Sequence, residues 1–281
     1  MDESFAKDCC ATRWPLFLIH GLGFHDSSRF RYWGRIPEAL FAHGAQICFG
    51  LQDAWGSCES NARTLRTTLL DFVEQTACEK VNVIAHSKGG LDTRVLAAME
   101  DCAPHIASIT TVASPHAGSR TMDVIMRVPA PLFRFAAVPV NAFFRLMGDV
   151  SPDFYGVCSQ LTTASMQRFN ERYPTAPALY CQSYIGTMTG VSTDVTMAFS
   201  YLVVRCFDGD NDGLVALASA PFGEYRGVIE GPGPRGLSHC DVIDLRRRPR
   251  KTGLTGAPEA EVFDIVNWYI RLVSDLKRRG L

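Results

Sequence analysis

The sequence lacks the features that would assign it to a membrane, to an export route or to nucleic acid. No apolar run reaches the ~18 residues that a membrane span requires, and Asp2, Glu3, Lys7 and Asp8 lie where a signal peptide would be apolar. The formal net charge is −1 over 281 residues, and the basic run at 246–251 is most simply an exposed loop. We therefore expect a cytoplasmic protein without a nucleic-acid partner, or a secreted one if a leader was removed.

The cysteines also lack the spacing of a disulfide or zinc framework. Ten cysteines are present, no two of them form a C-x-x-C pair, and several lie within apolar runs. Free and mostly buried thiols in a reducing compartment are the simplest interpretation of this distribution.

What the sequence does contain is an alternation of short buried strands and amphipathic helices. Continuous apolar runs predict strands at 15–19, 45–49, 81–85, 106–113, 178–185 and 201–207, with a weaker one at 227–230. Apolar residues at helical spacing predict helices at 32–43, 61–78, 90–100 and 259–279. This alternation is typical of an α/β fold, a mostly parallel sheet with helices on both faces. Residues 1–281 are expected to form a single domain.

One segment, residues 120–155, interrupts the alternation. It is rich in aromatic and aliphatic residues, carries few charges and contains Pro129, Pro131 and Pro139. Because proline interrupts helices, we expect two or three short helices inserted over the sheet within about residues 120–160. The insertion could be a moving lid or a fixed cap, and both alternatives stay open.

Ser87 is a candidate nucleophile, at the point where an apolar strand turns into a helix. The segment Ala85-His86-Ser87-Lys88-Gly89 has the small-x-Ser-x-Gly pattern of the nucleophile elbow of α/β-hydrolases, with Ala85 replacing the usual first glycine. Small residues around the turn let the hydroxyl project above the sheet, and the helix N-terminus points toward it. The alternative is an ordinary strand-to-helix turn.

A serine nucleophile needs a base and a carboxylate that orients the base. In α/β-hydrolases the order along the chain is Ser, then Asp or Glu, then His. Four of the seven histidines precede Ser87 and two follow it too closely, so His239 is the candidate base. Three carboxylates after the predicted strand at 201–207 compete for the role of the acid: Asp208, Asp210 and Asp212. Their spacing also fits the start of an EF-hand, but Ser219 stands where that loop requires glutamate.

A series of short motifs follows along most of the chain: Leu18–Leu22, Tyr32–Pro37, Ala85–Arg94, Ser114–Ser119, Leu161–Thr163, Phe169–Asn170, Tyr173–Pro174, Asn211–Val215 and His239-x-Asp241. The same motifs occur in the same order in the bacterial true lipases, which are triacylglycerol lipases of the α/β-hydrolase superfamily. The chain therefore resembles this family. The resemblance implies an α/β-hydrolase fold with an inserted helical lid, and a serine carboxylic-ester hydrolase that forms an acyl-enzyme intermediate.

The resemblance also implies roles for particular residues. Asp212, followed by glycine and an apolar pair, becomes the acid of a triad with Ser87 and His239. The backbone N–H groups of Leu22 and Lys88 would form the oxyanion hole. Lys88 departs from the glutamine that is common in these lipases.

For metals and cofactors, the resemblance implies that the chemistry needs none but that a structural calcium is bound. One ligand would be Asp241, two residues after the base, and Asp194 is the best-placed partner. A pair of aspartates that caps loops without a metal is the alternative.

The expected partner is an ester or lipid substrate, and triacylglycerol fits the apolar insertion best. A carboxylesterase for soluble short-chain or specialised esters is the nearest alternative. A non-catalytic lipid-binding protein with the same fold is a more distant one. The oligomeric state stays open.

Overall fold

A computed structural model describes residues 5–24, 31–175, 177–230, 235–246 and 263–281. Two of the features predicted from sequence fall partly outside these ranges. They are the start of the last helix, residues 259–262, and most of the basic run at 246–251.

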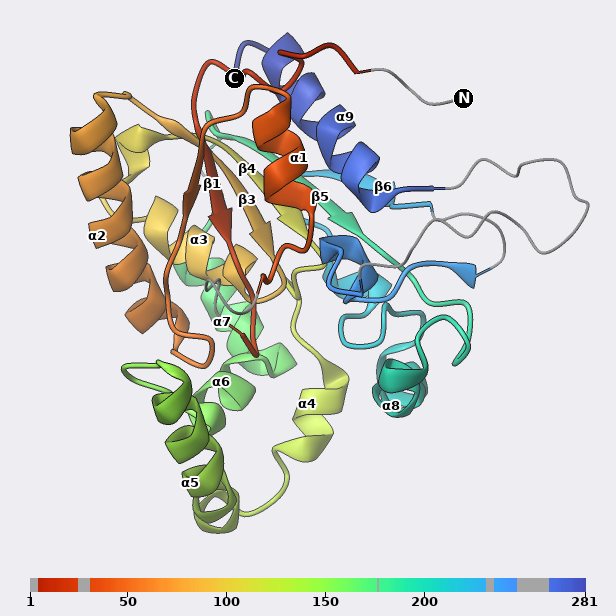
Figure 1. Ribbon diagram of the computed structural model, residues 1–281. Helices are drawn as coiled ribbons and strands as arrows, with labels where there is room; N and C mark the ends of the chain where they lie inside the picture. Colours follow the sequence, from red (N-terminus) through yellow and green to blue (C-terminus); the bar gives the residue numbers. More distant parts are fainter. Residues whose placement is uncertain (1–4, 25–30, 176, 231–234, 247–262) are drawn as a thin grey trace, which may run out of the picture.

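Within the described residues, six parallel strands form one sheet in the order β2-β1-β3-β4-β5-β6 (Figure 1). The strands are β1 Leu16–Ile19, β2 Ile47–Phe49, β3 Val81–His86, β4 Ile106–Val112, β5 Tyr180–Ile185 and β6 Glu224–Val228. Every residue of β1 and β3 is buried. A strand covered on both faces reads as a continuous apolar run, so these two strands were predictable.

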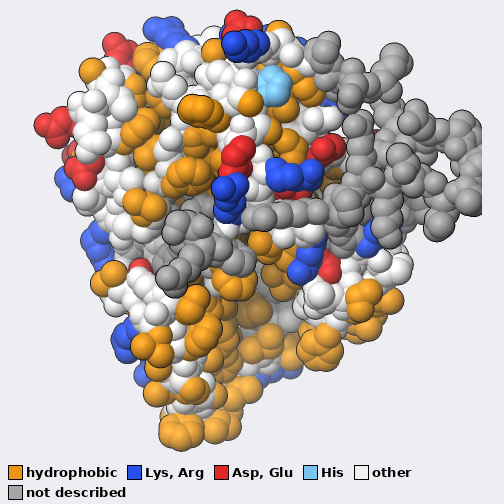
Figure 2. Space-filling model, viewed as in Figure 1, with side chains coloured by type: hydrophobic (Ala, Val, Ile, Leu, Met, Phe, Trp, Pro, Cys, Tyr) orange, Lys and Arg blue, Asp and Glu red, His pale blue; other side chains and the backbone are white. Residues whose placement is uncertain are grey.

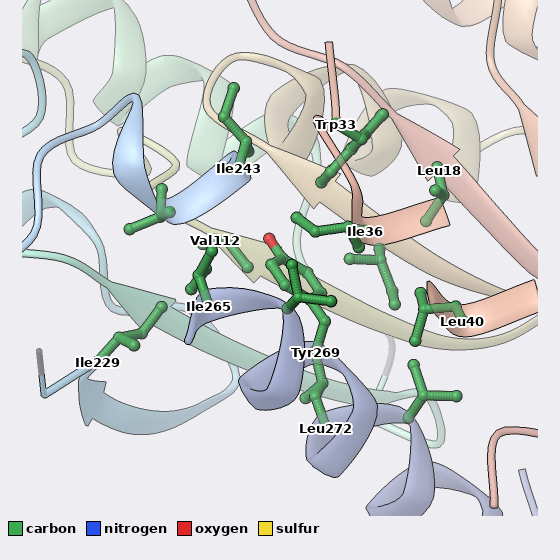
Figure 3. Packing of buried hydrophobic residues seen from close by; sticks show 14 of the residues in the cluster. Leu18, Trp33, Ile36, Leu40, Val112, Ile229, Ile243, Ile265, Tyr269 and Leu272 are labelled. Carbon is green, nitrogen blue, oxygen red and sulfur yellow. The ribbon is translucent and has the colours of Figure 1, made fainter. Parts of the chain in front are cut away.

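Two hydrophobic cores cover the two faces of the sheet. On one face, Leu16 and Leu18 of β1 pack against α1 (Ile36–Ala42) and α9 (Ile265–Arg278). Figure 3 shows Tyr269 of α9 at the centre of this cluster. On the other face, Phe17 and Ile19 pack against α2 (Cys58–Thr76) and α3 (Gly89–Ala97). The predicted α/β fold class is therefore confirmed.

Four helices lie between β4 and β5, in the region predicted as an insertion. They are α4 Arg120–Ile125, α5 Ala130–Met147, α6 Phe154–Gln160 and α7 Thr163–Arg172. In Figure 1, α4, α5 and α6 lie beyond the carboxyl ends of the strands. The expectation that each proline would interrupt a helix is wrong for Pro139, which lies inside α5. Pro129 and Pro131 stand at the start of α5, where a missing N–H costs nothing.

The predicted strand at 201–207 is wrong, because these residues belong to helix α8 (Ala198–Asp208). Tyr201 and Val204, three residues apart, face the protein, whereas Phe199 and Leu202 are exposed. A short apolar run does not by itself distinguish a strand from a helix, so this segment could not be assigned from sequence. The strand expected at 227–230 is present three residues earlier, as β6.

All ten cysteines are free thiols, and five of them are buried. Burial raises the pKa of Cys181 to about 12 and that of Cys48 to about 11, so these thiols stay protonated. The prediction of mostly buried thiols thus holds for half of the cysteines.

Candidate active site

Ser87 occupies a sharp turn between β3 and α3 with a φ of +55°, in the left-handed region. Its backbone N–H donates to Val112 O at 2.9 Å, which ties the turn to β4. A Cβ atom on Gly21 would lie 2.5 Å from Ser87 Cβ, and one on Gly89 would lie 2.4 Å from His20 O. The loop after β1 therefore packs directly on the turn because two glycines permit it. Strained backbone of this kind is found at functional sites.

Asp212 and His239, predicted from chain order and resemblance, are in contact. His239 Nδ1 lies 2.7 Å from Asp212 Oδ2, and both side chains are buried. A carboxylate only accepts hydrogen bonds, so Nδ1 carries the proton and Nε2 is the ring nitrogen with a lone pair. The N–H groups of Leu214 and Val215 donate to Asp212 Oδ1 at 3.0 and 2.8 Å. These contacts fix the carboxylate, and through it the imidazole.

The other two carboxylates of the same loop have different roles. Asp208 caps α4 by accepting hydrogen bonds from the backbone N–H groups of Arg120 and Thr121. Asp210 forms an exposed ion pair with Arg205. Asp212 is therefore the carboxylate that the fold places against His239.

Tyr32 and His86, to which sequence analysis gave no role, connect the candidate base to the turn. The rings of His86 and His239 lie 4.4 Å apart, which places His239 against the residue next to Ser87. Tyr32 Oη accepts from Gly21 N at 2.8 Å and is hydrogen-bonded to His86 Nδ1, 2.7 Å away. Burial, with the nearby His239, holds the pKa of His86 well below its usual value. His86 is thus a neutral residue that packs between Tyr32 and His239. Its partner Tyr32 could have been found from sequence, because it is the first residue of the Tyr32–Pro37 motif.

Leu22 and Lys88, the predicted oxyanion donors, lie on the two segments that meet at the turn. Leu22 follows Gly21 in the loop after β1, and Lys88 is the N-cap residue of α3. The Lys88 side chain is buried, and its Nζ lies 2.5 Å from Asp92 Oδ1 one helical turn later. Burial alone would lower the pKa of Lys88, but the attraction of Asp92 raises it. Where glutamine is common in these lipases, this chain therefore has a lysine that forms a buried ion pair with Asp92.

Asp194 and Asp241, the predicted metal ligands, both contact Ser238, the residue before His239. Asp194 Oδ2 accepts from Ser238 Oγ at 3.0 Å, and Asp241 Oδ2 accepts from Ser238 N at 3.0 Å. Asp194 also pairs with Arg246, with 2.8 Å between Oδ2 and Nε. Among the described residues, no cluster of three or more His, Cys, Asp or Glu side chains is arranged to hold a metal ion.

Helices long and apolar enough to cross a membrane are absent from the described part of the chain. The features that define the site are the parallel sheet, the strained serine turn at the end of β3, and the buried Asp212–His239 pair. Together these features are typical of the α/β-hydrolase fold.

Comparisons with known proteins identify the family. The chain is 30% identical to triacylglycerol lipase 2 of Saccharomyces cerevisiae, over 89% of this chain and 74% of that protein. It is 28% identical to a triacylglycerol lipase of Vibrio cholerae, over 96% of this chain and 89% of that protein. The crystal structure of Staphylococcus hyicus lipase has the same fold, with a TM-score of 0.65 at 17% identity, over 95% of this chain and 96% of that one. No protein-family model matches.

The chain belongs to the triacylglycerol lipase family of the α/β-hydrolase superfamily. It is a lipase-like serine ester hydrolase. The resemblance noted in the sequence is thereby confirmed.

Proposed function

We propose that the protein hydrolyses carboxylic esters with apolar acyl chains, triacylglycerol among them, using Ser87, His239 and Asp212. The observation that carries the proposal is the buried 2.7 Å hydrogen bond between Asp212 and His239, against the strained turn that bears Ser87. This arrangement supplies a nucleophile, an oriented base and a fixed carboxylate. The names of the relatives supply the substrate class.

In the proposed mechanism, His239 Nε2 removes the proton of Ser87 Oγ as the oxygen attacks the ester carbonyl carbon. Negative charge develops on the carbonyl oxygen, and the N–H groups of Leu22 and Lys88 are proposed to stabilise it. His239 then gives its proton to the leaving alcohol, which departs. Water attacks the acyl-enzyme in the same way, with His239 again taking the proton, and releases the acid and Ser87. No metal or cofactor takes part in this scheme.

An exposed apolar surface on α5 supports a lipid substrate. Leu132, Phe135, Val138 and Leu146 all point to solvent, and Leu146 is 87% exposed. Figure 2 shows hydrophobic side chains gathered over the lower end of the molecule, where α5 lies in Figure 1. Exposed apolar patches of this kind usually mark an interaction surface. We propose that α5 is a lid whose outer face contacts lipid.

A second candidate, a carboxylesterase for dissolved esters, is favoured by the way α5 is tied at its C-terminal end. Asp149 accepts from the N–H groups of Ala54 and Trp55, both at 2.9 Å. In return, Asp53 accepts from the N–H groups of Val150 and Ser151. This reciprocal pair of carboxylates would suit a cap that stays in place.

Hydrolysis of p-nitrophenyl esters from acetate to palmitate, together with emulsified triacylglycerol, tests these proposals. Wild type and Ser87→Ala are compared, and we expect the variant to lose turnover on every ester. An optimum at long chains with activity on emulsion supports the lipase, whereas an optimum at short dissolved esters supports the esterase. A folded wild type without turnover on any ester would instead indicate a non-catalytic lipid-binding protein.

A further inference from the structure

The backbone around the proposed base is held by one serine and two aspartates. Ser238 Oγ donates to Asp194 Oδ2 at 3.0 Å and accepts from Asp241 N at 3.1 Å. Ser238 N donates to Asp241 Oδ2 at 3.0 Å. Because His239 is the next residue, these three bonds position its backbone together with the 2.7 Å hydrogen bond from His239 N to Asp212 O. The segment before α8 and the loop of His239 are therefore one connected unit.

The residues present do not fit the calcium ion that the resemblance implies. Both oxygens of Asp194 already accept two hydrogen bonds each. Oδ1 takes Thr196 N at 3.1 Å and Thr196 Oγ1 at 2.8 Å, and Oδ2 takes Ser238 Oγ and Arg246 Nε. A carboxylate has about four lone-pair positions, so none is left for a metal. A cation there would also face the Arg246 guanidinium 2.8 Å from the same oxygen.

Arg246 holds this position through two contacts. Its Nε donates to Asp194 and its Nη2 donates to Thr196 Oγ1. The planar guanidinium therefore contacts two side chains of the same segment, two residues apart. The Asp194 carboxyl is 3% exposed and the Arg246 side chain 31% exposed, so water screens the pair only in part.

The charge state of the pair agrees with its geometry. Burial alone would raise the pKa of Asp194, but the hydrogen bonds from Thr196, Arg246 and Ser238 outweigh burial and lower it. The carboxylate is thus ionised at neutral pH and is compensated by a cation of the chain itself.

We infer that Arg246 is a positioning residue that takes the place of a metal ion: it fixes Asp194, which fixes Ser238 and with it the proposed base His239. The inference rests on the proposed function only for the role of His239. The guanidinium is covalently attached and has five donors, so the loop is held without any dependence on free calcium. The protein is accordingly a calcium-independent member of its family.

Arg246→Gln tests the inference, with Arg205→Gln as the matched control. Arg205 also pairs with an aspartate at 2.8 Å, but that pair is exposed and does not contact Ser238. For Arg246→Gln we expect kcat about tenfold lower with KM within about twofold of wild type, because the base is displaced while the acyl site is not. Arg246→Lys, which keeps the charge, should recover part of kcat. Arg205→Gln should behave as wild type.

The response to calcium distinguishes positioning from general stabilisation. The melting temperature of wild type should be the same in chelator and in millimolar calcium. Arg246→Gln, in which Asp194 loses its contact with the guanidinium, should gain melting temperature as calcium is added. Should Arg246→Gln fail to fold, Arg246→Lys is used for the same titration. Because the lysine keeps the positive charge, the kcat of this variant should be lower than that of wild type, and its melting temperature should not respond to calcium.

Two results would overturn the inference. One is a wild type that loses melting temperature in chelator or binds calcium stoichiometrically by calorimetry. The other is an Arg246→Gln protein with the kcat of Arg205→Gln and no calcium response. The melting and calorimetric measurements need no turnover and can be made on Ser87→Ala. A failure of the proposed ester hydrolysis is therefore seen separately from a failure of the inference.

Discussion

Single residues decide which nitrogen of the proposed base carries its proton. Asp212 accepts from His239 Nδ1 on one oxygen and from two backbone N–H groups on the other. An ionised carboxylate can only accept, and it therefore selects one tautomer of the imidazole. An amide in its place would present a donor to the same nitrogen and would favour the other tautomer.

Asp212→Asn should therefore lower kcat on p-nitrophenyl butyrate by about 10³- to 10⁴-fold while the protein stays folded. Asp210→Asn is the matched control, since Asp210 lies in the same loop and pairs with Arg205 at the surface. Its kcat should equal that of wild type. Equal activity of the two variants would show that Asp212 is not the acid.

Buried neutral histidines should make the protein less stable in acid. Burial, with a contribution from Arg94, holds the pKa of His116 well below its usual value, so the folded protein keeps it neutral. The unfolded chain takes up this proton below about pH 6.5, which favours unfolding as the pH falls, by up to about 1.4 kcal/mol per pH unit.

The imidazole of His116 packs on Phe222 with ring centroids 4.5 Å apart. Because His116→Gln loses this contact, it should have a lower melting temperature than wild type at pH 7. Its melting temperature should also fall less steeply between pH 7 and pH 5. Thermal unfolding followed by circular dichroism measures both effects. Parallel curves for the two proteins would mean that His116 does not titrate on unfolding.

At the scale of elements, α5 shows which features of a helix could be predicted from the sequence and which could not. Its apolar and aromatic composition predicted an inserted helical region, and its position between β4 and β5 agrees with that. The internal Pro139 could not be placed from sequence, because a helix tolerates proline when tertiary contacts hold both sides of it. Phe133, before Pro139, stacks on Phe154 of α6, and Phe144, after it, packs on Trp55.

If the outer face of α5 contacts lipid, Phe135→Ser with Leu146→Ser should lower activity on emulsified triacylglycerol severalfold. Activity on dissolved p-nitrophenyl butyrate should be unchanged, because both side chains point to solvent. Phe41→Ser, which removes an equally exposed aromatic ring from α1, is the control and should affect neither substrate. Equal losses on both substrates would favour a fixed cap over a lid.

At the scale of the whole molecule, charge is distributed unevenly. The formal net charge of the chain is −1, yet residues 124–148 contain three arginines and no Asp, Glu or Lys. The exposed apolar surface of α5 therefore also carries positive charge. A surface with both properties is attracted to anionic lipid, by about 1 kcal/mol for each basic residue near the membrane.

Ser87→Ala, which should not consume lipid, is expected to adsorb more strongly to vesicles with anionic phospholipid than to zwitterionic ones. Arg127→Gln with Arg145→Gln should remove most of the difference, and so should about 0.5 M salt, which screens exposed charges. Sedimentation of the vesicles measures the bound fraction. A preference for anionic vesicles that survives both changes would contradict this electrostatic argument.

The sequence by itself determined the fold class, the turn at Ser87 and the order of the candidate site residues. Each of these is local: β1 and β3 are buried on both faces and read as apolar runs, and small residues mark the turn. Chain order with the resemblance was also enough to select Asp212 and His239, which the fold brings into contact.

Only the tertiary structure decided the rest. Residues 201–207 form a helix, His86 packs against His239 and is hydrogen-bonded to Tyr32, and Arg246 pairs with Asp194, 52 positions away in the chain. A short apolar run fits a strand or a helix equally well until its neighbours are known. The partner of a buried charge likewise depends on which segments pack together in the fold, and this cannot be predicted from the local sequence.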